Sequence, residues 1–280
     1  MSSNDALAQA RSLLFVPGNR PERFLKAAQS GADAVVLDLE DAVPLAQKDA
    51  ARDAIRQQWT PLLALQVPLV VRVNAADSAA WQADLAALTG LTQLAGVMVP
   101  KAESADALRH VHQCLPGVAL LPLVESAAGH DALTPIAAAP GVLRLVLGHV
   151  DFMADTGIQC SDDERELAPL RFAIAMATRL QRLAPAIDGV TVAIDDAERL
   201  REDTRRALRF GFGAKLCIHP RQVAGVHEAM APSAAELDWA RRVIAADAAA
   251  AGAAVQLDGR MVDAPVVLQA RRTMARAGRA

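Results

Sequence analysis

The sequence predicts an α/β fold, namely a (β/α)8 TIM barrel with a C-terminal helical extension. Short apolar runs rich in β-formers recur along the chain, helix-like segments separate them, and 280 residues suffice for one barrel-sized domain. The runs are apolar on both faces, as parallel strands are when helices cover one face and the barrel interior covers the other. Eight such runs favour a closed barrel over an open, doubly wound sheet. They lie at 12–16, 34–40, 68–74, 96–101, 119–125, 143–151, 189–194 and 214–220.

Residues between the runs have the patterns of helices and turns. Residues 102–113 and 197–210 place their apolar side chains at helical spacing. After the first run, Pro21 suits the start of a helix and Gly31 suits its end. This alternation of strand and helix is the order that a (β/α)8 barrel requires.

The chain beyond Pro232 forms a separate segment. Its pattern is helical to about residue 250, and an alanine-rich stretch at 245–254 then precedes VQLDGRMVDAP at 255–265. Because this tail follows the eighth run, we expect an appended helical segment or lid. The predicted domains are a catalytic barrel over residues 1–231 and a helical extension over 232–280.

Composition and charge argue against a nucleic-acid or membrane partner. The formal net charge of -3 and the pI of about 6.1 lack the basic excess that either surface would favour. No apolar run reaches membrane-spanning length, and the first residues do not resemble a signal peptide. The three cysteines have unrelated spacings, which excludes a disulfide framework and a zinc motif and predicts a cytoplasmic protein.

Polar residues follow the predicted strands at their carboxyl ends, where the active site of a barrel enzyme is built. Charges at the end of an apolar strand are costly unless they are paired or bind a metal ion. These residues are therefore the candidates for the chemistry: Asp38, Glu40, Asp41, Arg72, Asn74, Lys101, Glu125, His149, Asp151 and His219.

Glu125 and Asp151 end neighbouring predicted strands, the fifth and the sixth. Their carboxylates could meet around one hard cation, and Mg²⁺ is suited to two carboxylates because it keeps part of its water shell. The alternative is that each carboxylate pairs with a nearby arginine. Two acids on adjacent barrel strands favour the metal site.

Arg72 interrupts the apolar run VVRVN, and its planar guanidinium could grip a substrate carboxylate with two parallel hydrogen bonds. The alternative is a structural salt bridge with Asp38 or Glu40, and both can hold together. Glu40 and Asp41 could hold metal-bound waters or orient Arg72, or they could act only on the dipole of the following helix.

Other candidates carry weaker signals. Arg20 lies in PGNRPERF, where a tight turn and a helix start could hold a phosphate or carboxylate. His149 and His219 could reach the site, or they could be core or turn histidines. The chain has no glycine-rich dinucleotide fingerprint, no P-loop and no GxSxG serine motif.

Seven segments of the chain are distinctive when taken together. They are FVPGNRPERF, DAVVLDLEDAV, VVRVN, GVMVPK, PLVES, the Gly-x-x-Asp-Phe stretch at 148–152 and KLCIHPRQV. In this order and spacing they resemble the citrate lyase β subunit and its relatives in the HpcH/HpaI aldolase superfamily, which includes malyl-CoA and citramalyl-CoA lyases. The resemblance runs from about residue 11 to 270.

This resemblance implies a magnesium-dependent barrel enzyme that cleaves a 3-hydroxyacyl thioester into a 2-oxo acid and an acetyl thioester. Glu125 and Asp151 match the metal ligands of the family, and Arg72 matches its contact to the substrate carboxylate. Gly148 falls in the loop that lies against the oxo acid, and Arg20 falls near the arm of CoA or of an acyl-carrier protein.

The resemblance also implies partners and one catalytic group from the tail. In CoA-dependent relatives a late aspartate, in a Gly-x-x-(Ile/Val)-Asp stretch, acts as acid or base across a subunit interface, and Asp263 fits this pattern at 259–263. Relatives form trimers or hexamers, so we expect a homo-oligomer. His149 departs from the residue expected at its position, which leaves the preferred oxo acid open.

Three alternatives remain at this point. Lys101 could form a Schiff base as in an aldolase, because it ends a predicted strand. The same scaffold could instead hydrolyse or synthesise a thioester. The chain could also be a non-catalytic assembly subunit, although such a subunit needs none of Arg72, Glu125 and Asp151.

Overall fold

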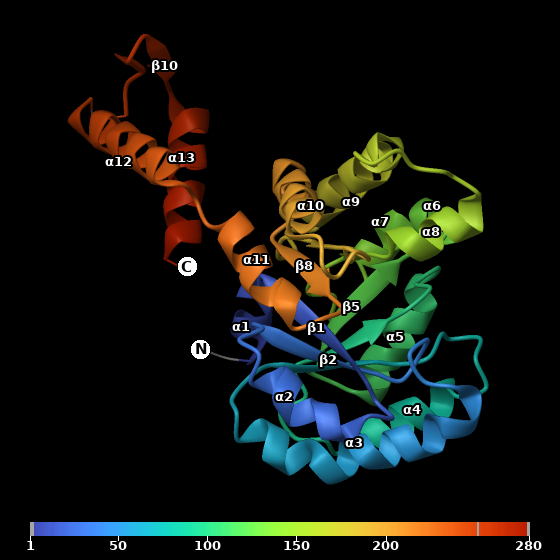
Figure 1. The fold of residues 1–280 in the computed structure, drawn as a ribbon. Coiled ribbons are helices and arrows are strands. Elements are labelled where there is room, and N and C mark those ends of the chain that lie inside the picture. The colour runs from blue at the N-terminus through green and yellow to red at the C-terminus, as the bar shows by residue number, and fades with distance from the viewer. Residues whose placement is uncertain (1–2, 251, 279–280) are drawn as a thin grey trace. The chain divides into compact units, whose positions relative to one another are not determined.

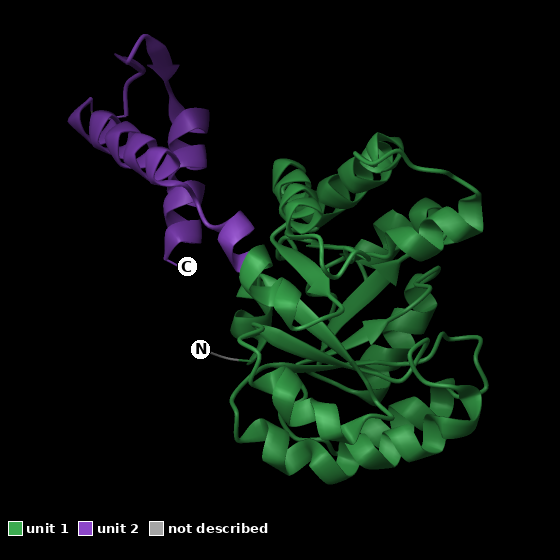
Figure 2. Cartoon of the chain, in the orientation of Figure 1, with its two compact units in different colours: residues 1–226 green, residues 227–280 purple. Residues whose placement is uncertain are grey.

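The computed structural model describes residues 3–250 and 252–278. The chain divides into two compact units, residues up to Val226 and residues from His227 onward (Figure 2). In the first unit eight parallel strands pair in sequence order, and the eighth pairs with the first (Figure 1). The predicted (β/α)8 barrel is confirmed. The predicted domain boundary between residues 231 and 232 remains a prediction.

Each barrel strand is a short, fully or largely buried apolar segment. The strands are β1 (Ser12–Pro17), β2 (Ala34–Asp38), β3 (Leu69–Arg72), β4 (Gly96–Val99), β5 (Ala119–Val124), β6 (Val146–Leu147), β7 (Ile187–Asp188) and β8 (Ala214–Cys217). Most end a few residues before the predicted limit, so several of the polar candidates lie just beyond a strand rather than in it.

Helices follow the strands around the barrel (Figure 1). They are α1 (Ser3–Gln9), α2 (Phe24–Ala28), α3 (Lys48–Leu63), α4 (Trp81–Leu88), α5 (Ala105–Cys114), α6 (Ala127–Asp131), α7 (Leu133–Ala137), α8 (His149–Thr156), α9 (Ala168–Leu180), α10 (Ala197–Arg209) and α11 (Arg221–Met230), with 3-10 turns η1 (Pro21–Arg23), η2 (Leu45–Gln47) and η3 (Arg165–Leu167). The helices predicted at 102–113 and 197–210 are thus present as α5 and α10.

The N-terminal segment closes the barrel at the amino ends of the strands. Leu7 and Ala10 are buried and belong to the same apolar cluster as the inward side chains of the strands. Arg144, itself buried, donates hydrogen bonds from Nη1 to the carbonyls of Leu7 (3.0 Å) and Ala10 (2.7 Å). The interior of the barrel is therefore a packed core, which leaves the carboxyl ends of the strands for a site.

The sixth strand is shorter than predicted. The run at 143–151 was expected to be one strand, but only Val146–Leu147 pair as β6, and Gly148 with φ -104° and ψ 71° becomes the N-cap of α8. His149 and Asp151 consequently belong to the first turn of a helix rather than to a strand. An aspartate is favourable there because the amino end of a helix carries partial positive charge.

The seventh strand lies earlier than predicted. The apolar run at 189–194 is not a strand, and the strand residues are Ile187 and Asp188, which pair with Val146 and with Ala214 and Lys215. Val192 is 64% exposed, so the run leaves the barrel wall instead of continuing it. Asp188, the last residue of this short strand, forms a buried ion pair with Lys215 at 3.4 Å.

The second unit consists of α12 (Ala234–Ala249), an antiparallel pair β9 (Val255–Leu257) and β10 (Arg260–Val262), and α13 (Ala264–Ala277). The predicted helix after Pro232 is confirmed as α12, and it begins with a capping box between Ser233 and Glu236. A small apolar core joins the helices and the strand pair, with Val243, Val262 and Val267 buried in it.

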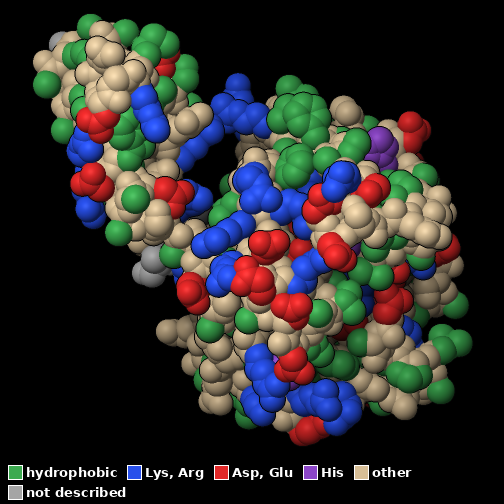
Figure 3. All heavy atoms as spheres, turned by 45° about the horizontal axis from the view of Figure 1, so that its top comes forward, with side chains coloured by type: hydrophobic (Ala, Val, Ile, Leu, Met, Phe, Trp, Pro, Cys, Tyr) green, Lys and Arg blue, Asp and Glu red, His purple; other side chains and the backbone are tan. Residues whose placement is uncertain are grey.

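The surface carries both signs of charge. On the face of the first unit shown in Figure 3, lysines and arginines are interspersed with aspartates and glutamates. No helix in the described ranges has both the length and the apolar character needed to cross a membrane.

Candidate active site

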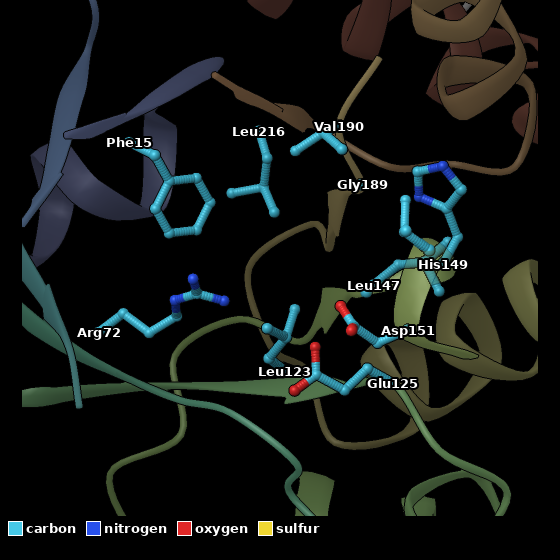
Figure 4. Close-up of a pocket in the computed structure, with 12 residues that line it drawn as sticks. Phe15, Arg72, Leu123, Glu125, Leu147, His149, Asp151, Gly189, Val190 and Leu216 are labelled. Carbon is cyan, nitrogen blue, oxygen red and sulfur yellow. The ribbon is translucent and has the colours of Figure 1, made fainter. Parts of the chain in front are cut away.

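A pocket opens at the carboxyl ends of the barrel strands (Figure 4). It combines a small set of charged side chains with an apolar wall, the usual composition of a small-molecule site. The polar lining consists of Arg72, Glu125, His149 and Asp151, the apolar wall of Phe15, Leu123, Leu147, Val150, Val190 and Leu216, and the backbone of Gly148 and Gly189.

Glu125 and Asp151 come together in this pocket, as their strand positions predicted. Glu125 follows β5 and is 3% exposed, whereas Asp151 is exposed on the first turn of α8. Their carboxylates point toward one another in Figure 4, and the guanidinium of Arg72 points into the pocket from the opposite side. The backbone N–H of Lys101 donates to Oε1 of Glu125 at 2.7 Å, which fixes this carboxylate and leaves Oε2 available.

Gly148 is required for the close approach of Glu125 and α8. A Cβ atom at this position would lie 2.6 Å from both Cβ and Oε2 of Glu125, much closer than atoms can pack. Because Gly148 is also the N-cap of the helix that carries Asp151, its missing side chain sets the spacing of the two carboxylates.

We expect Gly148→Ala to lower the affinity for Mg²⁺ at least tenfold, because the new methyl group must displace the Glu125 carboxylate. Metal-site ligands must lie within about 0.5 Å of their working positions, and this displacement would be larger. Isothermal titration with MgCl₂ measures this. Gly278→Ala is the matched control, since a Cβ there meets no atom closer than 3.8 Å. Unchanged Mg²⁺ affinity in a folded Gly148→Ala protein would contradict the role of this spacing.

Arg72 is held by three carboxylates, one at the end of β2 and two in the turn that follows it. Asp38 accepts from Nε and from Nη2, both at 2.7 Å, in a two-pronged contact. Nη1 lies 2.8 Å from Oε2 of Glu40 and 3.6 Å from Oδ2 of Asp41, and the guanidinium carbon lies 4.9 Å from the centre of the Phe15 ring. The salt bridge that we weighed as an alternative is therefore present, and Arg72 also lines the pocket.

Glu40 and Asp41 lie in a turn and not at a helix amino end, since the next helical residue is Leu45. Of the interpretations that the sequence left open, the geometry favours orientation of Arg72 over a helix-dipole effect. Glu40 is buried, and Asp38 fixes the turn by accepting from the backbone N–H of Glu40 (2.9 Å) and of Ala42 (3.2 Å).

A buried polar network supports this turn from behind. Nζ of Lys48 donates to the carbonyls of Leu39 (2.6 Å) and Glu40 (2.7 Å), and Nδ2 of Asn74 donates to the same Leu39 carbonyl (3.0 Å). Asp84 accepts from Nδ2 of Asn74 at 2.6 Å. Because each of these buried groups has a partner, the network holds the acidic turn rigidly over Arg72.

The side of the pocket formed by Glu125 and Asp151 has more carboxylates than cations. Burial, together with the negative charges of Glu40 and Asp151, raises the pKa of Glu125 to about 8. Burial and the neighbouring charges of Asp41 and Asp38 raise the pKa of Glu40 to about 7, although Arg72 opposes this. Burial alone would lower the pKa of Arg72, but its contacts with Asp38 and Glu40 raise it above its ordinary value. A divalent cation at this place would relieve the repulsion between Glu125 and Asp151.

His149 lines the pocket but belongs to a second polar cluster. It is 5% exposed, and its Nε2 lies 3.9 Å from Oε1 of Glu164. Its ring packs against Gly189, where a Cβ would lie 2.1 Å from Nδ1. Burial lowers the pKa of His149, although Glu164 and Asp188 oppose the shift.

The other predicted residues lie in different surroundings. Arg20 is exposed and pairs with Glu22 at 2.6 Å, outside the pocket lining. Lys101 is exposed and contributes its backbone N–H to Glu125. His219 is a turn histidine, whose Nδ1 accepts from the backbone N–H of Arg221. Asp263 lies in the second unit, where it is the N-cap of α13 and accepts from the N–H of Val266.

Three features of the site were not predicted. Phe15 lies within an apolar run and gave no polar signal, yet it packs against Arg72. Gly189 was read as the start of a strand, although its missing side chain makes room for His149. Asp188, at the end of β7, could have been found by the strand-end rule had β7 been placed correctly.

The chain is similar to known proteins over most of its length. A family model described as HpcH/HpaI aldolase/citrate lyase matches residues 11–220. A "Citrate lyase subunit beta-like protein" of Mycobacterium tuberculosis is 42% identical over 273 residues, covering 95% of each chain. A "(3S)-malyl-CoA thioesterase" of Cereibacter sphaeroides is 33% identical over 270 residues, covering 95% of this chain and 94% of the relative.

The fold agrees equally well with a crystal structure of protein CitE from Mycobacterium tuberculosis in complex with magnesium, acetoacetate and coenzyme A. That chain is 39% identical, the TM-score is 0.84, and the match covers 97% of this chain and 99% of the other. The barrel, the strand-end carboxylates and the matched length all lead to one assignment. The chain belongs to the HpcH/HpaI aldolase/citrate lyase family.

Proposed function

We propose that this protein is a magnesium-dependent carbon–carbon lyase that cleaves a 3-hydroxyacyl thioester of the citryl, malyl or citramalyl type. The products are a 2-oxo acid and an acetyl thioester. The observation that carries the proposal is the pair of carboxylates, Glu125 and Asp151, that face one another across from the guanidinium of Arg72 in one open pocket (Figure 4). The magnesium and coenzyme A in the CitE complex support it.

The residues present fit a magnesium ion. Glu125 and Asp151 supply hard oxygen ligands, and Gly148 leaves room for Oε2 of Glu125. Within the described ranges no group of three or more His, Cys, Asp or Glu side chains could hold a metal ion, so these two carboxylates would act alone. A site of this kind suits Mg²⁺, which retains waters and accepts substrate oxygens in its remaining positions.

The substrate would be held between these carboxylates and Arg72. The guanidinium of Arg72 lines the pocket and faces the two carboxylates, which suits contact with the carboxylate next to the reacting carbon (Figure 4). The hydrogen bond to Asp38 holds the side chain of Arg72 in position. When bound, Mg²⁺ would supply Lewis-acid polarisation of the hydroxyl-bearing carbon's oxygen.

Cleavage requires two proton movements. The hydroxyl group loses its proton as its carbon becomes the ketone of the 2-oxo acid, and the bond to the neighbouring carbon breaks. The electron pair of that bond stays on the carbon next to the thioester carbonyl, which must gain a proton to become the methyl group of the acetyl thioester. Asp263, from another copy of the chain in a homo-trimer or homo-hexamer, is our candidate for the group that supplies this proton, and a water molecule is the alternative.

The partner molecules follow from this chemistry. We propose an acyl thioester of CoA or of an acyl-carrier protein, with Arg20 near its anionic arm, and a 2-oxo acid. All three cysteines are free, as expected for a cytoplasmic enzyme.

Incubation of the protein with Mg²⁺ and a panel of hydroxyacyl-CoA esters, followed by mass spectrometry, tests the proposal. We expect a 2-oxo acid and acetyl-CoA to appear together, and EDTA to stop their formation. No turnover of any ester, with no binding of Mg²⁺ or a 2-oxo acid, would instead support a non-catalytic assembly subunit. A covalent adduct trapped by borohydride on Lys101 would support the Schiff-base alternative.

A second candidate is thioester hydrolysis on the same scaffold, favoured by the relative named as a (3S)-malyl-CoA thioesterase. In that case the same assay gives free CoA together with a hydroxy acid whose carbon–carbon bond is intact. The two reactions are therefore separated by the masses of their products.

Mixing two inactive variants tests the role of Asp263. Asp263→Asn and Glu125→Gln should each lose activity alone, because one lacks the proton donor and the other lacks the metal ligand. If the aspartate acts in a neighbouring subunit, co-expressed mixtures regain up to about a quarter of the activity per site, since a random mixture places intact tails over intact barrels that often. No recovery in mixed oligomers would place the action of Asp263 within its own chain or exclude it.

A further inference from the structure

A second hollow adjoins the active-site pocket. It has a volume of about 500 Å³, compared with about 70 Å³ for the pocket, and it shares His149, Val150 and Val190 with it. Val190 and His149 lie on the side of the pocket away from Arg72 (Figure 4). Since cavities that hold small molecules are commonly of this size, the hollow could take a part of the substrate that projects beyond the metal site.

The edge of the hollow next to the pocket is aliphatic. Beyond Val150 and Val190 it is lined by Met153, Val192 and Ala193, and Val150 and Val192 are 41% and 64% exposed. Val192 belongs to the apolar run that leaves the barrel after β7 instead of continuing it. Consecutive apolar residues exposed in a loop are unfavourable for a free surface and suggest contact with a ligand.

The far side of the hollow is charged, but its charges are already paired. Arg199 lies 3.2 Å from Oε1 of Glu164 and 2.9 Å from Oδ1 of Asp203, and Asp196 accepts from the backbone N–H of Arg199. Asp162, which lines the same side, lies 3.9 Å from Nη1 of Arg199. Because Arg199 is already paired, it is not free to bind a further negative charge.

This charged side is rigid. Oε2 of Glu164 accepts from Arg171 (2.6 Å) and Arg206 (2.8 Å), and the glutamate is buried with φ 47°, a left-handed conformation that costs energy for a residue other than glycine. Such a residue persists only where its surroundings hold it firmly. The hollow is therefore preformed and need not be opened by a ligand.

We propose that this hollow is a subsite for an uncharged carbon chain carried by the hydroxyacyl substrate. The inference rests on the proposed lyase function and narrows its substrate class. The enzyme would prefer substrates with a neutral, apolar extension over substrates with a second carboxylate on that side. The chain could belong to the 2-oxo-acid half or to the acyl half, because both meet at the metal site.

Binding and condensation assays test both halves. With Mg²⁺ and acetyl-CoA, the 2-oxo acids pyruvate, 2-oxobutanoate, 2-oxopentanoate and 2-oxohexanoate form one series, and 2-oxoglutarate is the charged comparison. With Mg²⁺ and pyruvate, acetyl-, propionyl- and butyryl-CoA form the other. In one of the two series we expect kcat/KM to rise about fourfold per added methylene until the hollow is filled, from the transfer free energy of a methylene group. The series that shows the rise identifies the half.

Two variants of residues that line only the hollow sharpen the test. Ala193→Trp fills it and should abolish the gain with chain length, expressed as the ratio of the longest to the shortest substrate. Ala86→Trp, on the exposed face of α4, is the matched control and should keep that ratio. Val192→Arg adds a free cation at an exposed position and should raise the relative rate with 2-oxoglutarate at least tenfold.

The results of these assays distinguish failure of the subsite from failure of the lyase proposal. If Mg²⁺-dependent binding of pyruvate is measured but neither series gains with length, or if Ala193→Trp leaves the gain intact, the subsite is wrong and the lyase proposal stands. If neither Mg²⁺ nor any 2-oxo acid binds, both are overturned.

Discussion

Glu125→Gln is expected to remove Mg²⁺ binding and to lower turnover by on the order of 10³-fold or more, because the ion stabilises the transition state by several kcal/mol. The amide keeps the size of the side chain and can still accept the hydrogen bond from the N–H of Lys101. The loss would therefore report on the missing negative charge and not on a collapsed loop. Isothermal titration with MgCl₂ and the mass-based turnover assay measure the two effects.

The same substitution should leave the fold as stable as before. Glu125 is buried and its pKa is raised to about 8, so the folded protein already disfavours its charged form. An unchanged or higher melting temperature, together with lost Mg²⁺ binding, is the expected combination. Glu202→Gln, at an exposed position of α10, is the control. Full turnover in Glu125→Gln would reject the metal site.

Arg72→Lys is expected to lower kcat/KM by on the order of 10²-fold, mainly through a higher KM for the 2-oxo acid. A lysine keeps the positive charge but cannot make the two-pronged contact with Asp38 and face the pocket at the same time. Steady-state kinetics in the condensation direction separate KM from kcat. Arg56→Lys, exposed on α3, serves as the control.

Complete removal of the charge should act on stability as well. In Arg72→Met the buried carboxylates of Asp38 and Glu40 lose their partner, which costs about 3–5 kcal/mol when one member of a buried ion pair is removed. Chemical denaturation would measure this loss. Equal KM values for the wild type and Arg72→Lys would show that this guanidinium does not bind the substrate.

Much of the site followed from one rule about parallel strands. Polar residues after apolar strands indicated Glu40, Arg72, Glu125 and Asp151, because the carboxyl ends of barrel strands meet at one face. Glu125, Arg72 and Asp151 do line one pocket, and Glu40 contacts Arg72. The rule succeeded because it depends on the order of strands and not on their precise ends.

Precise ends mattered for the sixth and seventh strands. Apolar content predicted strands at 143–151 and 189–194. The sixth strand is only Val146–Leu147, and the seventh is Ile187–Asp188, before the predicted run. Gly148 is the N-cap of α8, and a side chain there would collide with Glu125, which lies 23 residues away in sequence. No local pattern reports this close approach, so Asp151 was placed on a strand although it lies on a helix that lines the pocket.

The sequence by itself determined the barrel, the order of its strands and the candidate carboxylates, because these follow from the alternation of apolar segments with helices and turns. Only the tertiary structure decided which charges pair with which. Arg72 could have bound Asp38 or Glu40, and it contacts both. Val190, Val192 and Ala193 were expected in a strand, but they line a hollow beside the pocket. Pairing and burial depend on distances between segments that are far apart along the chain, and local sequence patterns carry no record of those distances.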